Sequence, residues 1–206
     1  RCTAIKIIFI HKKIADVFLK KFIQSVNELP LGLPWDEKAF ITPLPEENKC
    51  QSMTDYVNDA LEKGAKIINE NGGNFCKTIF HPAVLYPVNK DMNVYHKEQF
   101  GPVVPIVPFD DVSIPISYIE ESNVGQQASI FGKNPDTIAK LIDPMVNQVS
   151  RVNINSQCQR GPDSFPFTGR KDSAEGTLSV NDALRVFSIR TLVAAKETDL
   201  NKEIFS

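Results

Sequence analysis

Cys2 is the residue with the clearest chemical potential, and it stands in the opening segment Arg1-Cys2-Thr3-Ala4. A thiolate is the strongest common nucleophile among protein side chains, and a neighbouring cation such as Arg1 favours its formation near neutral pH. A β-rich apolar tract, residues 5–10, follows directly. The segment therefore has two interpretations: a catalytic nucleophile in front of a buried strand, or an ordinary strand with a chance cysteine.

A second polar segment, residues 97–102, precedes an apolar stretch that begins at Val103. Glu98 could accept a hydrogen bond from a ligand hydroxyl, and Phe100 could pack on a flat ring. The alternative is a solvated glutamate and a core phenylalanine beside a Gly-Pro turn. A third segment, residues 123–131, contains Gly125, which suits a turn that feeds a strand and is mainly structural.

A fourth segment, residues 155–169, combines one arginine with aromatic residues and rigid turns. Arg160 could bind a phosphate, because a guanidinium matches phosphate geometry with two parallel hydrogen bonds. The alternative is an arginine paired with Asp163 inside a structural loop. Both interpretations remain open from the local sequence.

The elements that position these segments alternate between strand and helix patterns. We expect strands at residues 4–10, 65–68, 78–88, 103–109, 127–131, 149–154 and 191–195. We expect helices at residues 12–29, 52 or 54 to 63, 112–121, 135–145 and 180–188, with a long irregular loop at residues 30–49 that holds four prolines. In the first helix Ile14, Val17, Phe18, Phe22 and Val26 should face inward, as should Tyr56, Val57 and Leu61 in the second. Pro82 and Pro87 argue that residues 78–88 lie at a sheet edge.

This alternation predicts an α/β fold with a central, mostly parallel sheet flanked by helices. The chain has 206 residues, 42% hydrophobic and 23% charged, with a net charge of −2. These values suit an ordinary globular protein and give no reason to expect a nucleic-acid or membrane partner. The four widely spaced cysteines and three scattered histidines form no zinc motif, so we expect free thiols in a reducing cytosol and no metal.

The four polar segments, in this order and spacing, resemble the aldehyde dehydrogenase superfamily, and within it the non-phosphorylating, NADP-dependent glyceraldehyde-3-phosphate dehydrogenases. The resemblance spans nearly the whole chain and rests on residues 1–4, 98–103, 127–131, 159–163 and 165–167. It implies that glyceraldehyde 3-phosphate is oxidised to 3-phosphoglycerate in the cytoplasm, as a glycolytic step. It further implies NADP as cofactor, with NAD possible, a small-molecule aldehyde as substrate, and a homo-oligomer.

The same resemblance implies specific roles. Cys2 matches the nucleophile that forms a thioester, and its backbone N–H part of the oxyanion hole. Glu98 matches the residue that holds the nicotinamide ribose, and Phe100 the residue beside the nicotinamide. Arg160 and Arg1 would hold the substrate phosphate, and Phe167 would line the aldehyde pocket.

The resemblance divides the chain into a catalytic domain, residues 1–189, and a C-terminal oligomerisation strand and tail, residues 190–206. The family's cofactor-binding domain, which supplies the general base, the oxyanion asparagine and most cofactor contacts, is absent from this chain. We therefore expect the isolated chain to be inactive. Ala174 stands where the family usually has glycine, which leaves the shape of its loop open. The alternatives are another aldehyde dehydrogenase, such as a semialdehyde dehydrogenase, or a non-catalytic assembly module.

Overall fold

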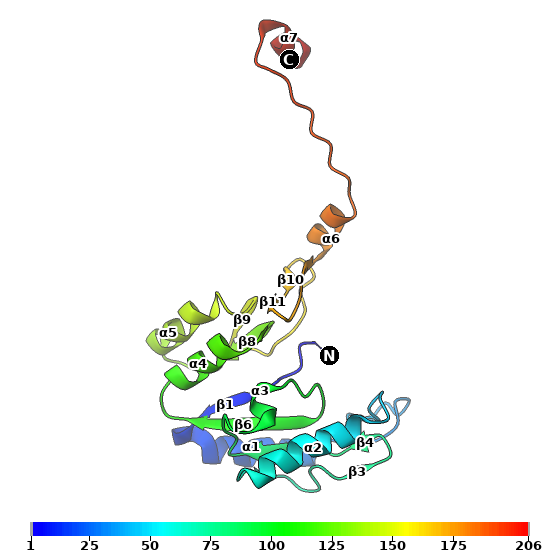
Figure 1. The fold of residues 1–206 in the computed structure, drawn as a ribbon, viewed down its shortest axis with the longest axis vertical. Coiled ribbons are helices and arrows are strands. Elements are labelled where there is room, and N and C mark those ends of the chain that lie inside the picture. Colours follow the sequence, from blue (N-terminus) through cyan, green and yellow to red (C-terminus); the bar gives the residue numbers. More distant parts are fainter. Residues whose placement is uncertain (1, 206) are drawn as a thin grey trace.

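A four-stranded sheet lies at the centre of the computed structural model, which describes residues 2–205 (Figure 1). Strand β6 (Val103–Phe109) pairs in parallel with β1 (Ile8–His11) on one side and with β5 (Ala83–Tyr86) on the other. The short strand β2 (Lys66–Ile67) extends the sheet antiparallel to β5. The predicted α/β fold with a mostly parallel sheet is confirmed.

Helices α1 (Ala15–Asn27) and α2 (Lys49–Glu62) cover opposite faces of this sheet. Successive residues of a strand point to opposite faces. In β5, Val84 packs in one apolar cluster with Phe18 and Phe22 of α1. Ala83 and Leu85 pack in a second cluster with buried residues of α2: Cys50, Met53, Val57 and Ala60. Because both faces are covered, the strands are almost continuously apolar.

A second layer contains a separate parallel pair, β8 (Gln127–Ile130) and β9 (Arg151–Ile154). The pair packs with helices α4 (Ser113–Glu121) and α5 (Pro135–Met145) around Ile130, Met145 and Val149 (Figure 1). Helix α5 begins where the sequence predicts, because Asn134 accepts a hydrogen bond from the backbone N–H of Thr137 and Pro135 occupies the first turn.

The remaining elements are short. They are η1 (Lys12–Ile14), β3 (Phe75–Cys76), β4 (Ile79–Phe80), α3 (Asn93–His96), β7 (Val124–Gly125), β10 (Phe167–Thr168), β11 (Arg170–Lys171), β12 (Thr177–Leu178), α6 (Val180–Val186) and α7 (Asp199–Phe205). None of the helices within residues 2–205 has the length and apolar character that a membrane span requires.

The predicted edge position of residues 78–88 is wrong. Strand β5 lies between β6 and β2, and so has a neighbour on both sides. Pro82 and Pro87 flank the strand rather than interrupting it. Neither proline therefore removes a hydrogen-bond donor from the paired residues.

The first two predicted elements are shorter than expected. Strand β1 begins only at Ile8, and residues 2–7 form turns and irregular chain. The predicted helix at residues 12–29 opens as the 3₁₀ turn η1, which rotates Ile14 and Val17 outward, with 55% and 65% of their surface exposed. Helix α2 begins before the predicted cap, because the hydroxyls of Ser52 and Thr54 donate to carbonyls four residues earlier. Its Leu61, predicted to face inward, is 40% exposed.

Residues 190–198 belong to no helix or strand, and in Figure 1 this segment leads away from the two layers to α7. Its apolar side chains Leu192 and Val193 are exposed, as is Ile189 just before it. The predicted strand at residues 191–195 thus has no partner within residues 2–205. The oligomerisation strand stays a prediction, because its pairing partner would belong to another chain.

Candidate active site

Cys2 lies on the surface, in a turn, as a free thiol. Its position in a turn argues against the alternative of a chance cysteine within a strand and leaves the sulfur accessible. Arg1 lies outside the described residues. The other three cysteines are also free thiols, as predicted: Cys50, Cys76 and Cys158.

The segment that follows α3 turns one side chain inward and two outward. Gln99 is 2% exposed, whereas Glu98 and Phe100 on either side of it are exposed. The backbone of Phe100 has a φ of 44°, a conformation that few non-glycine residues adopt. Phe100 is therefore not a core residue: 51% of its surface remains exposed, directly beside a carboxylate.

Gln99 links this segment to the one that contains Cys2. Its Nε2 donates to the backbone carbonyl of Lys6 at 2.8 Å and to that of Val103 at 2.7 Å. Asp59 of α2 holds the other end of the segment, since its carboxylate accepts from the backbone N–H and the side chain of Asn93 at 2.7 and 2.8 Å. These bonds fix the backbone on both sides of Glu98.

The loop that contains Arg160 is held by side chains of β8 and β9. Gln127 accepts from the backbone N–H of Gln159 at 3.1 Å and donates to its carbonyl at 2.9 Å. Arg151 donates to the carbonyls of Gln159 and Gly161 at 3.2 and 2.9 Å. Asn153, 4% exposed, donates to Gln127 at 3.2 Å and so fixes the amide that holds the loop.

Arg160 is exposed, and its guanidinium carbon lies 5.5 Å from the centre of the Phe167 ring. Cation–π contact of this kind orients an arginine while its N–H donors stay open to solvent. Within residues 2–205 no ion pair joins Arg160 to Asp163, so the structural alternative for Arg160 is not supported. The structure brings Arg160 and Phe167 together, as expected of residues that share one site.

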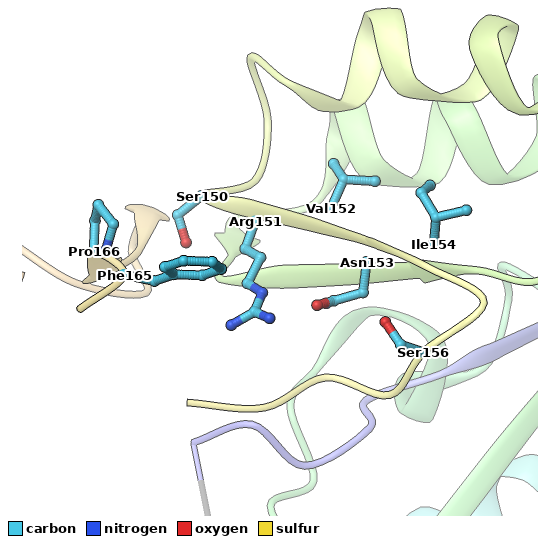
Figure 2. Close-up of a pocket in the computed structure, with 8 residues that line it drawn as sticks. All are labelled: Ser150, Arg151, Val152, Asn153, Ile154, Ser156, Phe165 and Pro166. Carbon is cyan, nitrogen blue, oxygen red and sulfur yellow. The ribbon is translucent and has the colours of Figure 1, made fainter. Parts of the chain in front are cut away.

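An open cavity of about 400 Å³ lies beside this loop. It is lined by Ser150, Arg151, Val152, Asn153, Ile154, Ser156, Phe165 and Pro166 (Figure 2). Figure 2 shows Arg151 and Asn153 on one side of β9 and Val152 and Ile154 on the other, toward the helices. Arg151, whose guanidinium carbon lies 5.7 Å from the centre of the Phe165 ring, escaped the sequence analysis. The alternation of polar and apolar residues at positions 151–154 was the signal for it.

The loop around Ala174 has a defined shape. Strand β11 pairs antiparallel with β7, and the Ser173 hydroxyl accepts from the backbone N–H of Gly125 at 2.8 Å. A Cβ at Gly125 would lie 2.1 Å from the carbonyl oxygen of Gln148, so only glycine allows this approach. Gly125 is therefore structural, as predicted.

No hydrogen bond or ion pair within the described part of the chain joins Cys2 to Glu98 or to Arg160. Of the predicted residues, Glu98 and Phe100 flank Gln99 in the segment before β6, Arg160 lies with Phe167 beside β9, and Cys2 is joined to neither group by such a bond. Residues 2–205 contain no cluster of three or more side chains that could hold a metal ion.

Residues 1–193 match the model of the aldehyde dehydrogenase family. The chain belongs to this family. It is 34% identical over 196 residues to an NADP-dependent glyceraldehyde-3-phosphate dehydrogenase of Pisum sativum, covering 94% of this chain and 38% of that protein. It is 30% identical over 175 residues to a 3-sulfolactaldehyde dehydrogenase of Priestia aryabhattai, covering 85% of this chain and 36% of that protein.

A solved structure supports the fold of this aldehyde dehydrogenase chain directly. The crystal structure of NADP-dependent glyceraldehyde-3-phosphate dehydrogenase from Bacillus halodurans, complexed with NADP, superposes with a TM-score of 0.83 and 35% identity. The superposition covers 89% of this chain and 38% of that one. The aldehyde dehydrogenase chain described here thus spans about two fifths of the length of its relatives.

The residues around Glu98 fit one end of a nicotinamide nucleotide. An exposed carboxylate can accept hydrogen bonds from the paired hydroxyls of a ribose, and the half-exposed ring of Phe100 offers a flat apolar surface. Both side chains project from a segment whose backbone is anchored on either side. Their roles in binding remain predictions.

Proposed function

We propose that the protein to which this chain belongs oxidises glyceraldehyde 3-phosphate to 3-phosphoglycerate with NADP, through a thioester on Cys2. The observation that carries the proposal is the exposed free thiol of Cys2 in a segment tied by Gln99 to the exposed carboxylate of Glu98. This bond ties the chain four residues after Cys2 to the residue that follows Glu98. Such prior positioning is a large part of enzymatic rate acceleration.

Each residue has one task in this proposal. The Cys2 thiolate attacks the aldehyde carbon, and its backbone N–H donates to the oxygen that becomes negative. Glu98 accepts from the nicotinamide ribose, and Phe100 limits the movement of the ring beside it. When bound, NADP⁺ would supply the acceptor for the hydride that leaves the former aldehyde carbon; water would then add to the thioester and release the acid, returning the thiolate of Cys2. Most contacts to NADP, the general base and the oxyanion asparagine are assigned to the preceding domain.

Arg160 is assigned to the substrate phosphate, together with Arg1, and Phe167 to the wall of the aldehyde pocket. The exposed guanidinium held over a ring supports this assignment, as do relatives named for glyceraldehyde 3-phosphate. The relative named for 3-sulfolactaldehyde favours one alternative substrate, since a sulfonate is also an anion with three terminal oxygens. A semialdehyde, whose anion is a carboxylate, is the other. NAD is the alternative cofactor.

A homo-oligomer formed through residues 190–206 belongs to the same proposal. The exposed apolar side chains of Leu192 and Val193 support it, because such residues in extended chain can pair with another copy. A cytoplasmic location also stays part of the proposal. A non-catalytic assembly role for the chain is the rival function, and it would require no thioester on Cys2.

The experiment that tests the proposal compares the full-length protein with its Cys2→Ala variant. The wild type should reduce NADP with glyceraldehyde 3-phosphate and without added inorganic phosphate, and the variant should lose this activity while binding NADP as tightly. Normal turnover by Cys2→Ala would remove the nucleophile from the mechanism. Preference for a sulfonated or carboxylated aldehyde would change the substrate and leave the reaction class intact.

A further inference from the structure

Lys6 makes the longest-range polar contacts of the segment that contains Cys2. Its Nζ donates to the carbonyl of Val94 at 2.5 Å and to that of Tyr95 at 3.4 Å, both in α3. The last carbonyls of a helix have no partner within the helix and carry partial negative charge. An ammonium group is therefore well matched to this helix end.

A second contact runs in the opposite direction. The buried side chain of Gln99 donates to the backbone carbonyl of Lys6 at 2.8 Å and, at the same time, to that of Val103 at 2.7 Å. The Lys6 side chain thus bonds to residues that precede Glu98 in the sequence. The side chain of Gln99, the residue after Glu98, bonds to the backbone of Lys6. We call this pair of reciprocal contacts the Lys6–Gln99 clasp.

Charged and aromatic groups surround the clasp from several elements. Burial lowers the pKa of Lys6 to about 8, and the carboxylate of Glu98 partly opposes this change. Burial raises the pKa of Tyr118 of α4 to about 12, and Glu98 adds to that shift too. Tyr95, whose pKa burial also raises with a contribution from Glu121, packs edge-on against Tyr118 at 5.0 Å. The carboxylate of Glu98 is thus close enough to act on both Lys6 and Tyr118.

Solvent does not reach the side chain of Gln99 to replace its bonds, because Gln99 is 2% exposed. Without the Lys6 side chain the α3 carbonyls of Val94 and Tyr95 lose a donor, and a buried acceptor without a partner is costly. Strand pairing cannot substitute, because β1 begins only at Ile8. The chain between Cys2 and β1 is therefore tied to the Glu98 segment by side chains alone.

We propose that Lys6 and Gln99 are positioning residues that set where Glu98 stands relative to Cys2. The inference rests on the proposed function for the identity of the ligand, since Glu98 is there assigned to the nicotinamide ribose. The bonds of the Lys6 and Gln99 side chains go to backbone carbonyls, so neither residue is assigned a contact with nucleotide or aldehyde. Their task is to hold the carboxylate and the thiol on one rigid unit.

The test uses the full-length protein with Lys6→Met, which keeps most of the apolar stem and removes the ammonium. Lys6→Arg is the conservative variant, and Lys12→Met is the control, because Lys12 makes a surface ion pair with Asp110. Hydrogen exchange of the backbone at residues 97–102 reports on the clasp without any ligand. Equilibrium binding of NADP and the alkylation rate of Cys2 by iodoacetamide report on the two groups that it joins.

Lys6→Met should exchange about tenfold faster at residues 97–102 and bind NADP about tenfold more weakly, a change of about 1.4 kcal/mol. Alkylation of Cys2 should stay within about twofold, because the thiol remains exposed. Lys6→Arg should recover part of the protection, and Lys12→Met should match the wild type. If Lys6→Met does not fold, Gln99→Leu breaks the reciprocal bond and should show the same exchange and binding pattern.

Unchanged exchange and unchanged NADP binding in a folded Lys6→Met or Gln99→Leu protein would overturn the clasp. Equal changes in exchange and NADP binding in Lys12→Met would also overturn the clasp, since the loss of any lysine would then produce the effect. A wild-type protein that oxidises no aldehyde would refute the proposed function instead. The exchange measurement would still decide whether the clasp orders residues 97–102.

Discussion

Replacing Gln127 by leucine should loosen the Arg160 loop while the fold persists. The substitution keeps the side-chain volume and removes three hydrogen bonds: two with the backbone of Gln159, at 3.1 and 2.9 Å, and one with Asn153, at 3.2 Å. A typical intramolecular hydrogen bond contributes about 0.5–1.5 kcal/mol net. Because Gln127 is only partly buried, we take the lower part of that range.

The three groups that bond to Gln127 are not all left without a hydrogen-bond partner by the substitution. The carbonyl of Gln159 keeps its bond from Arg151, and the amide of Asn153 keeps its bond to the carbonyl of Ala128. Only the N–H of Gln159 is left without a protein partner. The free energy of unfolding should therefore fall by about 0.5–1.5 kcal/mol, roughly the contribution of one bond, and not by the sum of three.

The assay is urea unfolding of the 206-residue chain, combined with hydrogen exchange at residues 155–163. Gln126→Leu is the matched control, because the neighbouring Gln126 contributes a backbone carbonyl, which accepts from Ser150 and is unchanged by the substitution. In the full-length enzyme, Gln127→Leu should also raise KM for phosphorylated aldehyde by up to about tenfold. A loss of stability below about 0.5 kcal/mol with unchanged loop exchange would refute this account of how the loop is held.

Other consequences can be checked separately. Arg160→Ala in the full-length enzyme should raise KM for glyceraldehyde 3-phosphate by about tenfold or more and hardly change KM for a neutral aldehyde, because a charge-assisted hydrogen bond contributes about 1.5–3 kcal/mol; equal effects on both substrates would make Arg160 structural. Folding lowers the pKa of Lys6 from 10.5 to about 8, so between these two pH values the folded chain binds fewer protons than the unfolded chain. The free energy of unfolding of the wild type, relative to that of Lys6→Met, should therefore rise from about pH 8 to 10.5. A difference between the two proteins that does not change with pH in urea unfolding would contradict this. Gly125→Ala should destabilise the chain by about 3 kcal/mol because its Cβ would meet the Gln148 carbonyl, whereas Gly132→Ala, with no atom nearer than 3.7 Å, should be close to neutral. The 206-residue chain alone should oxidise no aldehyde and should sediment as a dimer; a clean monomer at high concentration or NADP-dependent turnover would contradict these two expectations.

The sequence predicted correctly those helices whose ends are determined by capping residues next to them in the chain. Helix α5 matches its predicted bounds because Asn134 and Pro135 determine its start without help from the rest of the fold. The position of β5 was mispredicted because a proline beside a strand and a proline inside one look alike in the sequence. Strand order depends on which strands are covered, and that information lies in distant residues.

Candidate site residues could be predicted from the sequence where they are reactive or charged side chains in polar segments. Arg160 and Phe167 were both singled out, and their side chains lie in cation–π contact, whereas their roles stay predictions. Lys6 and Gln99 were not singled out, because a bond between residues 93 positions apart leaves no periodic trace. Arg151 was missed for a related reason. It donates to two backbone carbonyls of a loop eight and ten residues further along the chain, and the sequence around Arg151 does not indicate these contacts.

The separation of β8 and β9 from the four-stranded sheet bears on how such an enzyme evolves. The apolar cluster beneath the Arg160 loop, built on Ile130, Met145 and Val149, shares no residue with the clusters that support β1 and β6. Substitutions that reshape the Arg160 loop, the proposed anion end of the substrate site, can therefore accumulate without disturbing the clusters that support β1 and β6. A lineage can exchange one aldehyde for another in small steps and retain its chemistry throughout.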